Sequence, residues 1–327
     1  MKLFIYCFRE FDEKQFFDEL QEKYDFTYEA TAEYPNMENA RLAEGFDAIS
    51  TTVTDLNGRL LERFASLGVR CVSSRSIGVD HIDLKAAERL GLRVFHVSYG
   101  PESVADYAVM MLLMSMRNMR QIMDRASVQD FSLKGKLGRD IGESTVGVMG
   151  TGRIGSTVIR HLKPFGCRIL ACDSRVNPAL SGLCEYVTAE ELYRESDAIT
   201  LHIPAAAENF HLIDRTVFRQ LKPGCILVNT ARGTLVDTEA MIEALEQGIL
   251  GGAALDVIEE ENGLYYLNRV GDCIVNRQMA QLRMFPNVIL TPHTAFYTEK
   301  TVREMAENTV KCMFDLKNGI SNPLIVI

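Results

Sequence analysis

The stretch TVGVMGTGRIG, residues 145–155, decides the fold of this chain. Its first five residues predict a buried β-strand, and Gly150, Gly152 and Gly155 follow with G-x-G-x-x-G spacing ahead of a helical pattern. In this context the first glycine permits a tight turn, the second lets the backbone approach a pyrophosphate, and the third lets helix and strand pack closely. The helix N-terminus then offers free N–H groups to the phosphates, so the stretch predicts a dinucleotide site.

The kind of dinucleotide is indicated by Asp173, which closes the next expected strand, 18 residues after Gly155. A carboxylate at this position accepts hydrogen bonds from both ribose hydroxyls and repels a 2′-phosphate. We therefore expect NAD rather than NADP, a preference that the nearby Arg175 weakens.

Short β-rich runs alternate with helical patterns on both sides of this stretch, which is typical of parallel sheets built from βαβ units. The expected strands cover residues 2–7, 25–30, 47–51, 70–73 and 92–96, and then 145–149, 168–172, 198–203, 225–229, 252–257 and 287–290. The expected helices include 57–67, 84–90, 101–127 and 298–317. If the last helix packs on the first series of strands, the first domain is discontinuous.

Length and composition agree with an ordinary globular protein. A chain of 327 residues predicts two domains. The longest wholly apolar run, 107–114, has eight residues, against the roughly 20 that a membrane-spanning helix needs. The N-terminus lacks the pattern of a signal peptide, so we expect a cytoplasmic protein without a membrane partner. A net charge of −9 disfavours nucleic acid as a partner.

The eight cysteines form no CxxC pair and no cluster with zinc spacing, so we expect reduced thiols and no metal site. The helix expected at 101–127 contains the run VMMLLMSM and is apolar on nearly every side. Such a helix is normally buried all round. It is either a core helix alone or a core helix that also meets a partner subunit, and we favour the second reading, a homodimer.

Three side chains follow the carboxyl ends of expected strands, where open α/β sheets bind their ligands. Arg232 lies in VNTARGTLVD, Glu261 in DVIEEE and His293 in TPHTAF. Each alone is commonplace, because a single arginine or glutamate is usually a surface charge and a single histidine is usually structural. Together, behind a dinucleotide fingerprint, they suggest a catalytic set.

These motifs resemble the D-isomer-specific 2-hydroxyacid dehydrogenases. The glycine motif with Asp173, NTARG-x-LVD, GGAALDV-x-E-x-E and PNVILTPHTA-x-YT match in order, as does SRSIGVDHID at 74–83, so the resemblance covers essentially the whole chain. It is strongest to the D-lactate dehydrogenase branch, including the vancomycin-resistance type. It implies an α/β fold of two doubly wound parallel-sheet domains. One is a flavodoxin-like substrate domain, 1–99 plus 299–327, and the other is a Rossmann NAD-binding domain, 100–298.

The resemblance also implies roles for these residues. His293 would be the acid that protonates a keto oxygen and the base in reverse. Glu261 would orient it and favour its protonated form. Arg232 would hold the substrate carboxylate and polarise the carbonyl. The other implied substrate contacts are Ile77, Gly78, Tyr99 and Phe296, and the implied cofactor contacts beyond the glycines and Asp173 are Val104, Arg153, Ile154, Ile203, Pro204, Asn209, Thr230, Ala231, Arg232 and Asp256.

The expected activity is an NAD-dependent D-lactate dehydrogenase that interconverts pyruvate, or a similar small 2-keto acid, with the D-2-hydroxy acid. The alternative is an enzyme for bulkier acids such as 2-ketoisocaproate or phenylpyruvate. A remoter alternative is an NAD(H)-sensing corepressor on the same fold. Phe296 and Asp173 depart from the vancomycin-resistance type, which tends towards a tyrosine and a non-acidic residue there. Residues 50–54 lack the tyrosine often found in the lactate enzymes.

Overall fold

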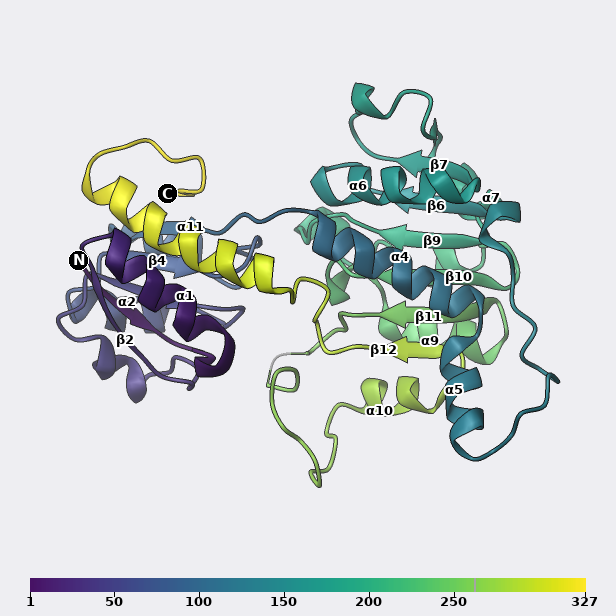
Figure 1. The fold of residues 1–327 in the computed structure, drawn as a ribbon, viewed down its shortest axis with the longest axis horizontal. Helices are drawn as coiled ribbons and strands as arrows, with labels where there is room; N and C mark the ends of the chain where they lie inside the picture. The colour runs from purple at the N-terminus through teal and green to yellow at the C-terminus, as the bar shows by residue number, and fades with distance from the viewer. Residues whose placement is uncertain (262) are drawn as a thin grey trace. The chain divides into compact units, whose positions relative to one another are not determined.

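The computed structural model describes residues 1–261 and 263–327, and these form two compact units (Figure 1). The N-terminal unit joins Met1–Gly100 to the chain's last segment, Tyr297–Ile327. The central unit is Pro101–Phe296. The chain therefore leaves the first unit, builds the second and returns to the first.

The N-terminal unit is a five-stranded parallel sheet of order β2-β1-β3-β4-β5, the doubly wound order of flavodoxin-like folds. Its strands are β1 (Lys2–Ile5), β2 (Thr27–Ala30), β3 (Ala48–Thr51), β4 (Cys71–Ser74) and β5 (Arg93–His96). Its helices are α1 (Glu10–Lys23), α2 (Gly58–Ser66), α3 (Leu84–Arg89) and α11 (Glu299–Lys317).

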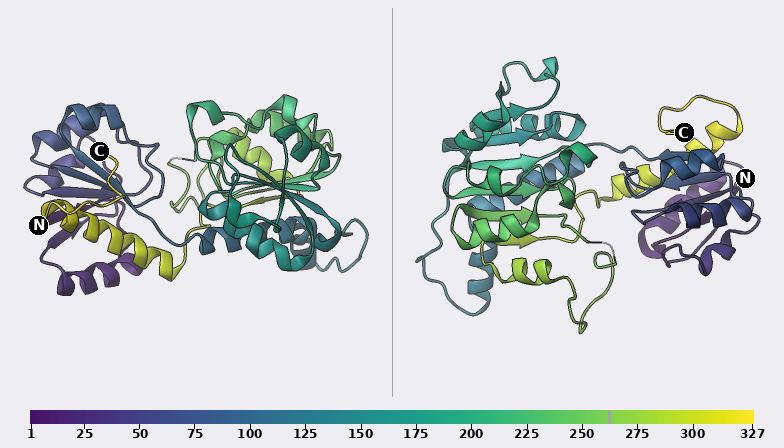
Figure 2. Two further views of the ribbon diagram at one scale, coloured as in Figure 1. Left: turned by 90° about the horizontal axis from the view of Figure 1, so that it is seen from above. Right: turned by 180° about the vertical axis from the view of Figure 1, so that it is seen from behind.

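Alternate residues along these strands face opposite layers of helices. Leu3 and Ile5 pack with α1 and α11 on one face, while Phe4 and Ile49 pack with α2 and α3 on the other. The last helix is thus part of the first unit's core, and Val302 on α11 is buried there. Figure 2 shows helices on both sides of this sheet.

The central unit is a seven-stranded parallel sheet of order β12-β11-β10-β9-β6-β7-β8. Its strands are β6 (Thr145–Met149), β7 (Arg168–Cys172), β8 (Glu185–Tyr186), β9 (Ala198–Leu201), β10 (Cys225–Asn229), β11 (Leu250–Leu255) and β12 (Val288–Leu290). The chain starts at β6, runs out to β8, then crosses back to β9, so β6 and β9 flank the switch point where such sheets bind ligands.

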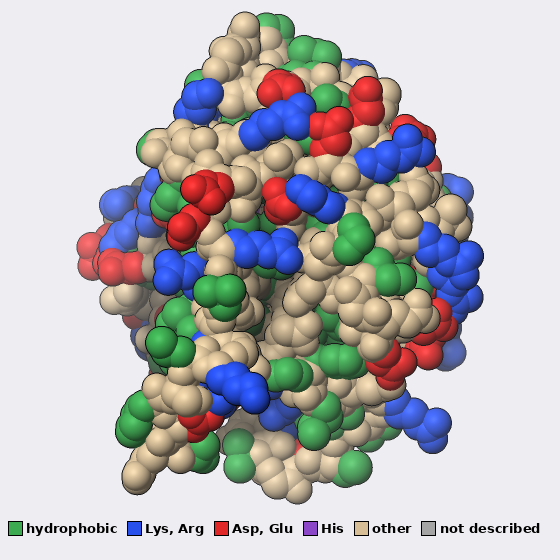
Figure 3. All heavy atoms as spheres, turned by 90° about the vertical axis from the view of Figure 1, so that its right-hand side faces the viewer, with side chains coloured by type: hydrophobic (Ala, Val, Ile, Leu, Met, Phe, Trp, Pro, Cys, Tyr) green, Lys and Arg blue, Asp and Glu red, His purple; other side chains and the backbone are tan. Residues whose placement is uncertain are grey.

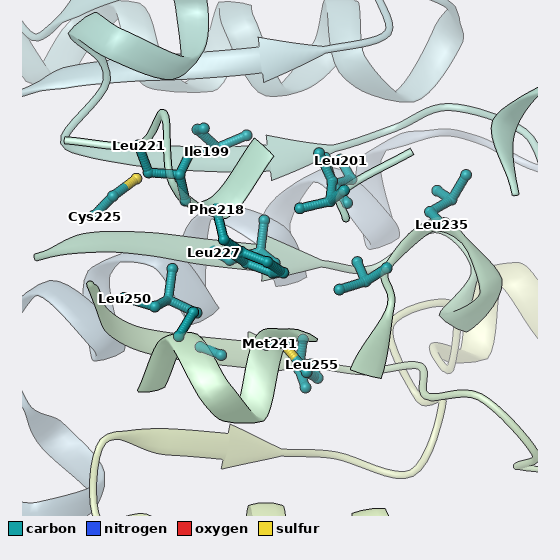
Figure 4. Packing of buried hydrophobic residues seen from close by; sticks show 14 of the residues in the cluster. Ile199, Leu201, Phe218, Leu221, Cys225, Leu227, Leu235, Met241, Leu250 and Leu255 are labelled. Carbon is teal, nitrogen blue, oxygen red and sulfur yellow. The ribbon is translucent and has the colours of Figure 1, made fainter. Parts of the chain in front are cut away.

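Helices cover both faces of this sheet. They are α4 (Glu102–Met116), α5 (Met119–Ser127), α6 (Arg153–Leu162), α7 (Ala189–Glu195), α8 (Arg215–Phe218), α9 (Thr238–Glu246) and α10 (Arg277–Met284). One face buries apolar side chains of α4 and α6. The other packs Leu227 and Leu255 against Phe218 of α8 and Met241 of α9 (Figure 4).

The predicted fold class is confirmed, and one expected helix differs. The helix expected at 101–127 is broken into α4 and α5, because Asn118 takes a left-handed backbone conformation with φ of 51°. Asparagine adopts this conformation more readily than most residues, and it ends one helix and begins the next. Between β11 and β12 lies α10, which begins directly after its N-cap residue, Asn276.

Candidate active site

The glycine motif forms the turn between β6 and α6. Gly150 has a φ of 89°, a left-handed conformation that favours glycine. A Cβ on Gly155 would lie 1.9 Å from the carbonyl oxygen of Gly150, so only glycine allows this approach. A Cβ on Gly152 would meet nothing within 4 Å. The backbone in front of the α6 N-terminus, which carries Arg153 and Ile154, is therefore open to a pyrophosphate.

Asp173 follows β7 and is tied to this turn. One carboxylate oxygen accepts the backbone N–H of Thr151 at 2.6 Å, and the other accepts that of Arg175 at 3.0 Å. Burial alone would raise the pKa of Asp173, but these hydrogen bonds outweigh it and hold the pKa below its ordinary value. Asp173 is thus a carboxylate at neutral pH, beside the turn where the ribose of a dinucleotide is expected.

The other expected cofactor contacts line the same edge of the sheet. Ile203 and Pro204 follow β9, and the side-chain amide of Asn209 donates to the carbonyl of Pro204 at 3.0 Å. Thr230 follows β10, and its buried hydroxyl has no hydrogen-bond partner among residues 1–261 and 263–327. An orphaned buried hydroxyl is costly unless a ligand satisfies it. The open turn, Asp173 and the Thr230 hydroxyl together fit NAD.

The three candidate catalytic residues follow neighbouring strands. Arg232 comes after β10, Glu261 after β11 and His293 after β12, and these strands are adjacent and parallel. Their carboxyl ends meet at one edge of the sheet, so the central unit brings together residues that lie up to 61 positions apart (293 − 232).

His293 and Glu261 form a close pair. The ring Nδ1 lies 2.5 Å from Oε1 of Glu261, and the two side chains are only 15% and 17% exposed. A carboxylate accepts hydrogen bonds, so Nδ1 carries the proton of this contact. The other nitrogen, Nε2, is then the one that can exchange a proton with a substrate.

The loop that carries His293 is held by buried contacts. His293 itself is left-handed, with a φ of 54°, and its N–H donates to the carbonyl of Asp256 at 2.8 Å. The Asp256 carboxylate is wholly buried and accepts hydrogen bonds from the Thr291 hydroxyl and from the backbone N–H groups of Thr294 and Ala295. Burial raises the pKa of Asp256 above its ordinary value. Through these three hydrogen bonds, the Asp256 carboxylate stabilises the conformation of the loop that carries His293.

Arg232 lies on a second tightly built loop. The Asn229 side chain donates to the carbonyl of Arg232 at 2.8 Å, and its oxygen accepts the N–H of Ala231 at 3.0 Å. Gly233 then passes so close to the next loop that a Cβ would lie 2.1 Å from the carbonyl of Ile258. Half-buried Arg232 is therefore locked in backbone position against the segment that leads to Glu261.

The remaining candidates are placed within their own units. Phe296 lies edge-on to the His293 ring, with 6.5 Å between ring centres. Val104 is buried near the start of α4. In the N-terminal unit, Ile77 and Gly78 lie on the loop after β4, where Ser76 donates to the carbonyl of Gly78 at 2.6 Å. Tyr99 is half-buried on the last segment before the central unit.

Several contacts of the site carried no signal in the sequence. Tyr266 donates its hydroxyl to the carbonyl of His293 at 2.8 Å, and Tyr107 of α4 pairs with Thr294 at 3.0 Å. Glu259 binds His211 rather than His293. A run of three glutamates cannot reveal which member faces the histidine, since this depends on the turn that the backbone makes there.

Among residues 1–261 and 263–327, no group of three or more histidine, cysteine, aspartate or glutamate side chains could hold a metal ion. All eight cysteines are free, five of them buried. In the same part of the chain, no helix combines the length and the hydropathy that crossing a membrane requires.

Comparison with known proteins agrees with this geometry. A family model described as the NAD binding domain of D-isomer specific 2-hydroxyacid dehydrogenases matches residues 109–295. A D-specific alpha-keto acid dehydrogenase of Enterococcus faecalis is 41% identical over 87% of each chain. An aromatic 2-oxoacid reductase of Clostridium sporogenes is 36% identical over 98% of each chain. The apo-structure of D-lactate dehydrogenase from Escherichia coli superposes with a TM-score of 0.88 at 33% identity, over the full length of both chains. The resemblance seen in the sequence is confirmed.

Proposed function

This chain belongs to the NAD-dependent, D-isomer-specific 2-hydroxyacid dehydrogenases, and we propose that its reaction is that of a D-lactate dehydrogenase. It would reduce pyruvate, or a similar small 2-keto acid, to the D-2-hydroxy acid and run in reverse with NAD. The observation that carries the proposal is the pair of His293 and Glu261, 2.5 Å apart, at the same sheet edge as Arg232.

The roles of the residues follow from their chemistry. NAD, when bound, supplies or accepts the hydride. His293 Nε2 gives a proton to the keto oxygen in reduction and takes it from the hydroxyl in oxidation. Glu261 keeps the Nδ1 proton in place and stabilises the charged ring that waits to donate. Arg232 pairs with the substrate carboxylate through charge-assisted hydrogen bonds and polarises the neighbouring carbonyl.

We propose two further sets of contacts. Ile77, Gly78 and Tyr99 would assist in binding the substrate, and Phe296 would pack against it beside His293. The residues of the glycine turn, with Asp173 and Thr230, would hold the pyrophosphate and ribose groups of NAD. These proposals rest on the matching motifs and on the open space and the orphaned hydroxyl described above.

For the size of the preferred substrate there is a second candidate. One relative of similar sequence identity is named an aromatic 2-oxoacid reductase. Phe296, at the edge of the histidine ring, and the small residues at 50–54 are features that would also suit a larger acid. The second candidate is therefore a D-2-hydroxyacid dehydrogenase for 2-ketoisocaproate or phenylpyruvate.

Steady-state kinetics separate the two candidates. The rate of NADH oxidation is measured with pyruvate, 2-ketobutyrate, 2-ketoisocaproate and phenylpyruvate, and kcat/KM is compared. We expect the highest value for pyruvate. A value for phenylpyruvate ten times that for pyruvate, which corresponds to about 1.4 kcal/mol of transition-state binding, would favour the second candidate.

We also propose that the protein is a homodimer that uses the region around α4 and α5. Most of α4 is explained without a partner, since its apolar side chains are buried in the central unit. The dimer is supported by large apolar side chains that remain exposed on α4, on α5 and in the segment after α5. They are Met110, Met123, Val128, Phe131, Leu133 and Leu137. Six large apolar side chains are thus exposed within residues 110–137, and exposed apolar patches mark interaction surfaces. Figure 3 shows apolar side chains exposed among both signs of charge on this side of the protein.

A further inference from the structure

A second histidine–carboxylate pair lies two residues before Glu261. Nε2 of His211 is 2.7 Å from Oε1 of Glu259. The other oxygen of Glu259 accepts hydrogen bonds from the backbone N–H of Thr238 at 3.0 Å and from its hydroxyl at 2.6 Å. One carboxylate therefore joins three segments: the loop after β9, the start of α9, and the loop after β11.

These contacts hold the backbone from which Glu261 projects. On its other side, the segment Ile258–Glu259 abuts Gly233, where a Cβ would lie 2.1 Å from the carbonyl of Ile258. The N–H of Ile258 also donates to the second oxygen of Glu261, at 3.2 Å. Glu260 turns the chain with a φ of 56° and is itself exposed. The backbone just before Glu261 is thus held by its close approach to Gly233 and by the side-chain contacts of Glu259.

Capping of α9 does not account for Glu259. That helix already has an N-cap, since the Asp237 side chain accepts the N–H of Ala240. His211 also has a left-handed backbone, with a φ of 51°, a conformation that is uncommon outside glycine, although histidine adopts it more often than most residues. The pair is partly shielded from solvent, with side chains 31% and 17% exposed.

We propose that His211 and Glu259 form a positioning pair that sets the place of Glu261 against His293. The proposal rests on the proposed roles of Glu261 and His293. In this arrangement His211 holds Glu259, and Glu259 in turn positions Glu261 against His293. Glu260, between them, is exposed to solvent. Neither member of the pair needs to touch substrate or cofactor, and each acts on the rate through Glu261.

The test is a double-mutant cycle on kcat for reduction of the best keto acid, with the thermal midpoint and the NADH dissociation constant measured for each variant. Glu259→Ala removes the contact, and Glu259→Gln keeps acceptance from Thr238. His211→Asn removes it from the other side, because asparagine is too short to reach Glu259 yet tolerates a left-handed backbone. Glu260→Ala is the matched control, one position along and exposed. Each change is made in the wild type and in Glu261→Gln.

We expect Glu259→Ala and His211→Asn to lower kcat by roughly 10- to 100-fold, the scale of a misplacement of about 1 Å, with KM and NADH binding unchanged. Glu259→Gln should restore part of the loss. In Glu261→Gln the same changes should have a much smaller effect, because the group that they position is already altered.

Three outcomes distinguish the possibilities. If Glu261→Gln lowers kcat and the Glu259 effect disappears in that background, the positioning pair is supported. If Glu261→Gln lowers kcat but Glu259→Ala behaves like Glu260→Ala, or adds its full effect in the double variant, the pair is not a positioning device and the roles of Glu261 and His293 stand. If Glu261→Gln leaves kcat unchanged, the proposed role of Glu261 fails and the positioning pair fails with it.

Discussion

His293 combines a left-handed backbone with a ring whose Nδ1 faces a carboxylate. In the proposed mechanism both features serve proton transfer, since the backbone turn directs the ring to Glu261 and the carboxylate leaves Nε2 as the working nitrogen. The negative charge of Glu261 also offsets the positive charge that the ring carries when it is protonated.

Glu261→Gln therefore tests the charge apart from the hydrogen bond. The amide oxygen still accepts from Nδ1 but carries no charge. The value of kcat for reduction should fall, because the amide no longer offsets the positive charge of the ring that donates the proton. Glu260→Gln serves as the control. A Glu261→Gln variant with the kcat of the wild type would remove Glu261 from the mechanism.

His293→Gln should abolish most turnover at every pH, by the roughly 10²–10⁴-fold that general acid catalysis contributes. Binding of NADH, followed by its fluorescence, should be unaffected, because the loss concerns proton transfer alone. Turnover within a few-fold of wild type would show that another group donates the proton.

We expect Asp173 to control the choice between NADH and NADPH. Its depressed pKa keeps it ionised at neutral pH, where its charge opposes a 2′-phosphate. Asp173→Asn should reduce the preference for NADH, because it removes the charge that opposes a 2′-phosphate and one of the two acceptor oxygens. Asp173→Ala should in addition weaken both cofactors, because the contact with the Thr151 N–H in the glycine turn is lost. The ratio of kcat/KM values for NADH and NADPH measures this, and a wild type that prefers NADPH would contradict it.

At the scale of elements, the strand ends could be predicted but the contacts between their loops could not. The alternation of strands with helices predicted that Arg232 and His293 each follow a strand. Because the strands of the sheet are parallel, their carboxyl ends lie at the same edge, and so do these two residues. The burial of Asp256 beneath the histidine loop and the pairing of His211 with Glu259 depend on tertiary contacts between distant segments. Neither apolar periodicity nor residue spacing records such contacts.

The approach of two of these loops predicts the effect of Gly233→Ala. A methyl group there would overlap the backbone of Ile258, which cannot rotate away as a side chain could. Overpacking of this kind costs about 1–3 kcal/mol, and here it separates the loops of Arg232 and Glu261. We expect a lower thermal midpoint and a loss of kcat of at least about tenfold.

Gly58→Ala is the matched control, since its Cβ would meet its nearest neighbours at an ordinary 3.4 Å. It should leave the activity unchanged. If Gly233→Ala were equally harmless, the loops would be more compliant than their close approach indicates.

At the scale of the whole chain, the sequence signalled where elements lie better than where they end. The apolar run of α4 predicted a helix, but the break at Asn118 was not evident, because asparagine is also found inside helices. The apolar pattern did not show which apolar side chains pack in the protein's own core and which are available to a partner. The structure distinguishes them, because the apolar side chains of α4 are mostly buried while those of the segment after α5 are exposed.

That segment carries the last prediction. Val128, Phe131, Leu133 and Leu137 are 75–92% exposed within ten residues, and covering them with a second copy would remove large apolar surface from water. The wild type should then sediment at about twice 36.7 kDa, and Phe131→Glu with Leu133→Glu should sediment nearer the mass of one chain. Phe11→Glu, which changes a solitary exposed phenylalanine of α1, should leave the mass unchanged. A double variant that keeps the wild-type mass would place the subunit contact elsewhere, and a wild type with the mass of one chain would exclude the dimer.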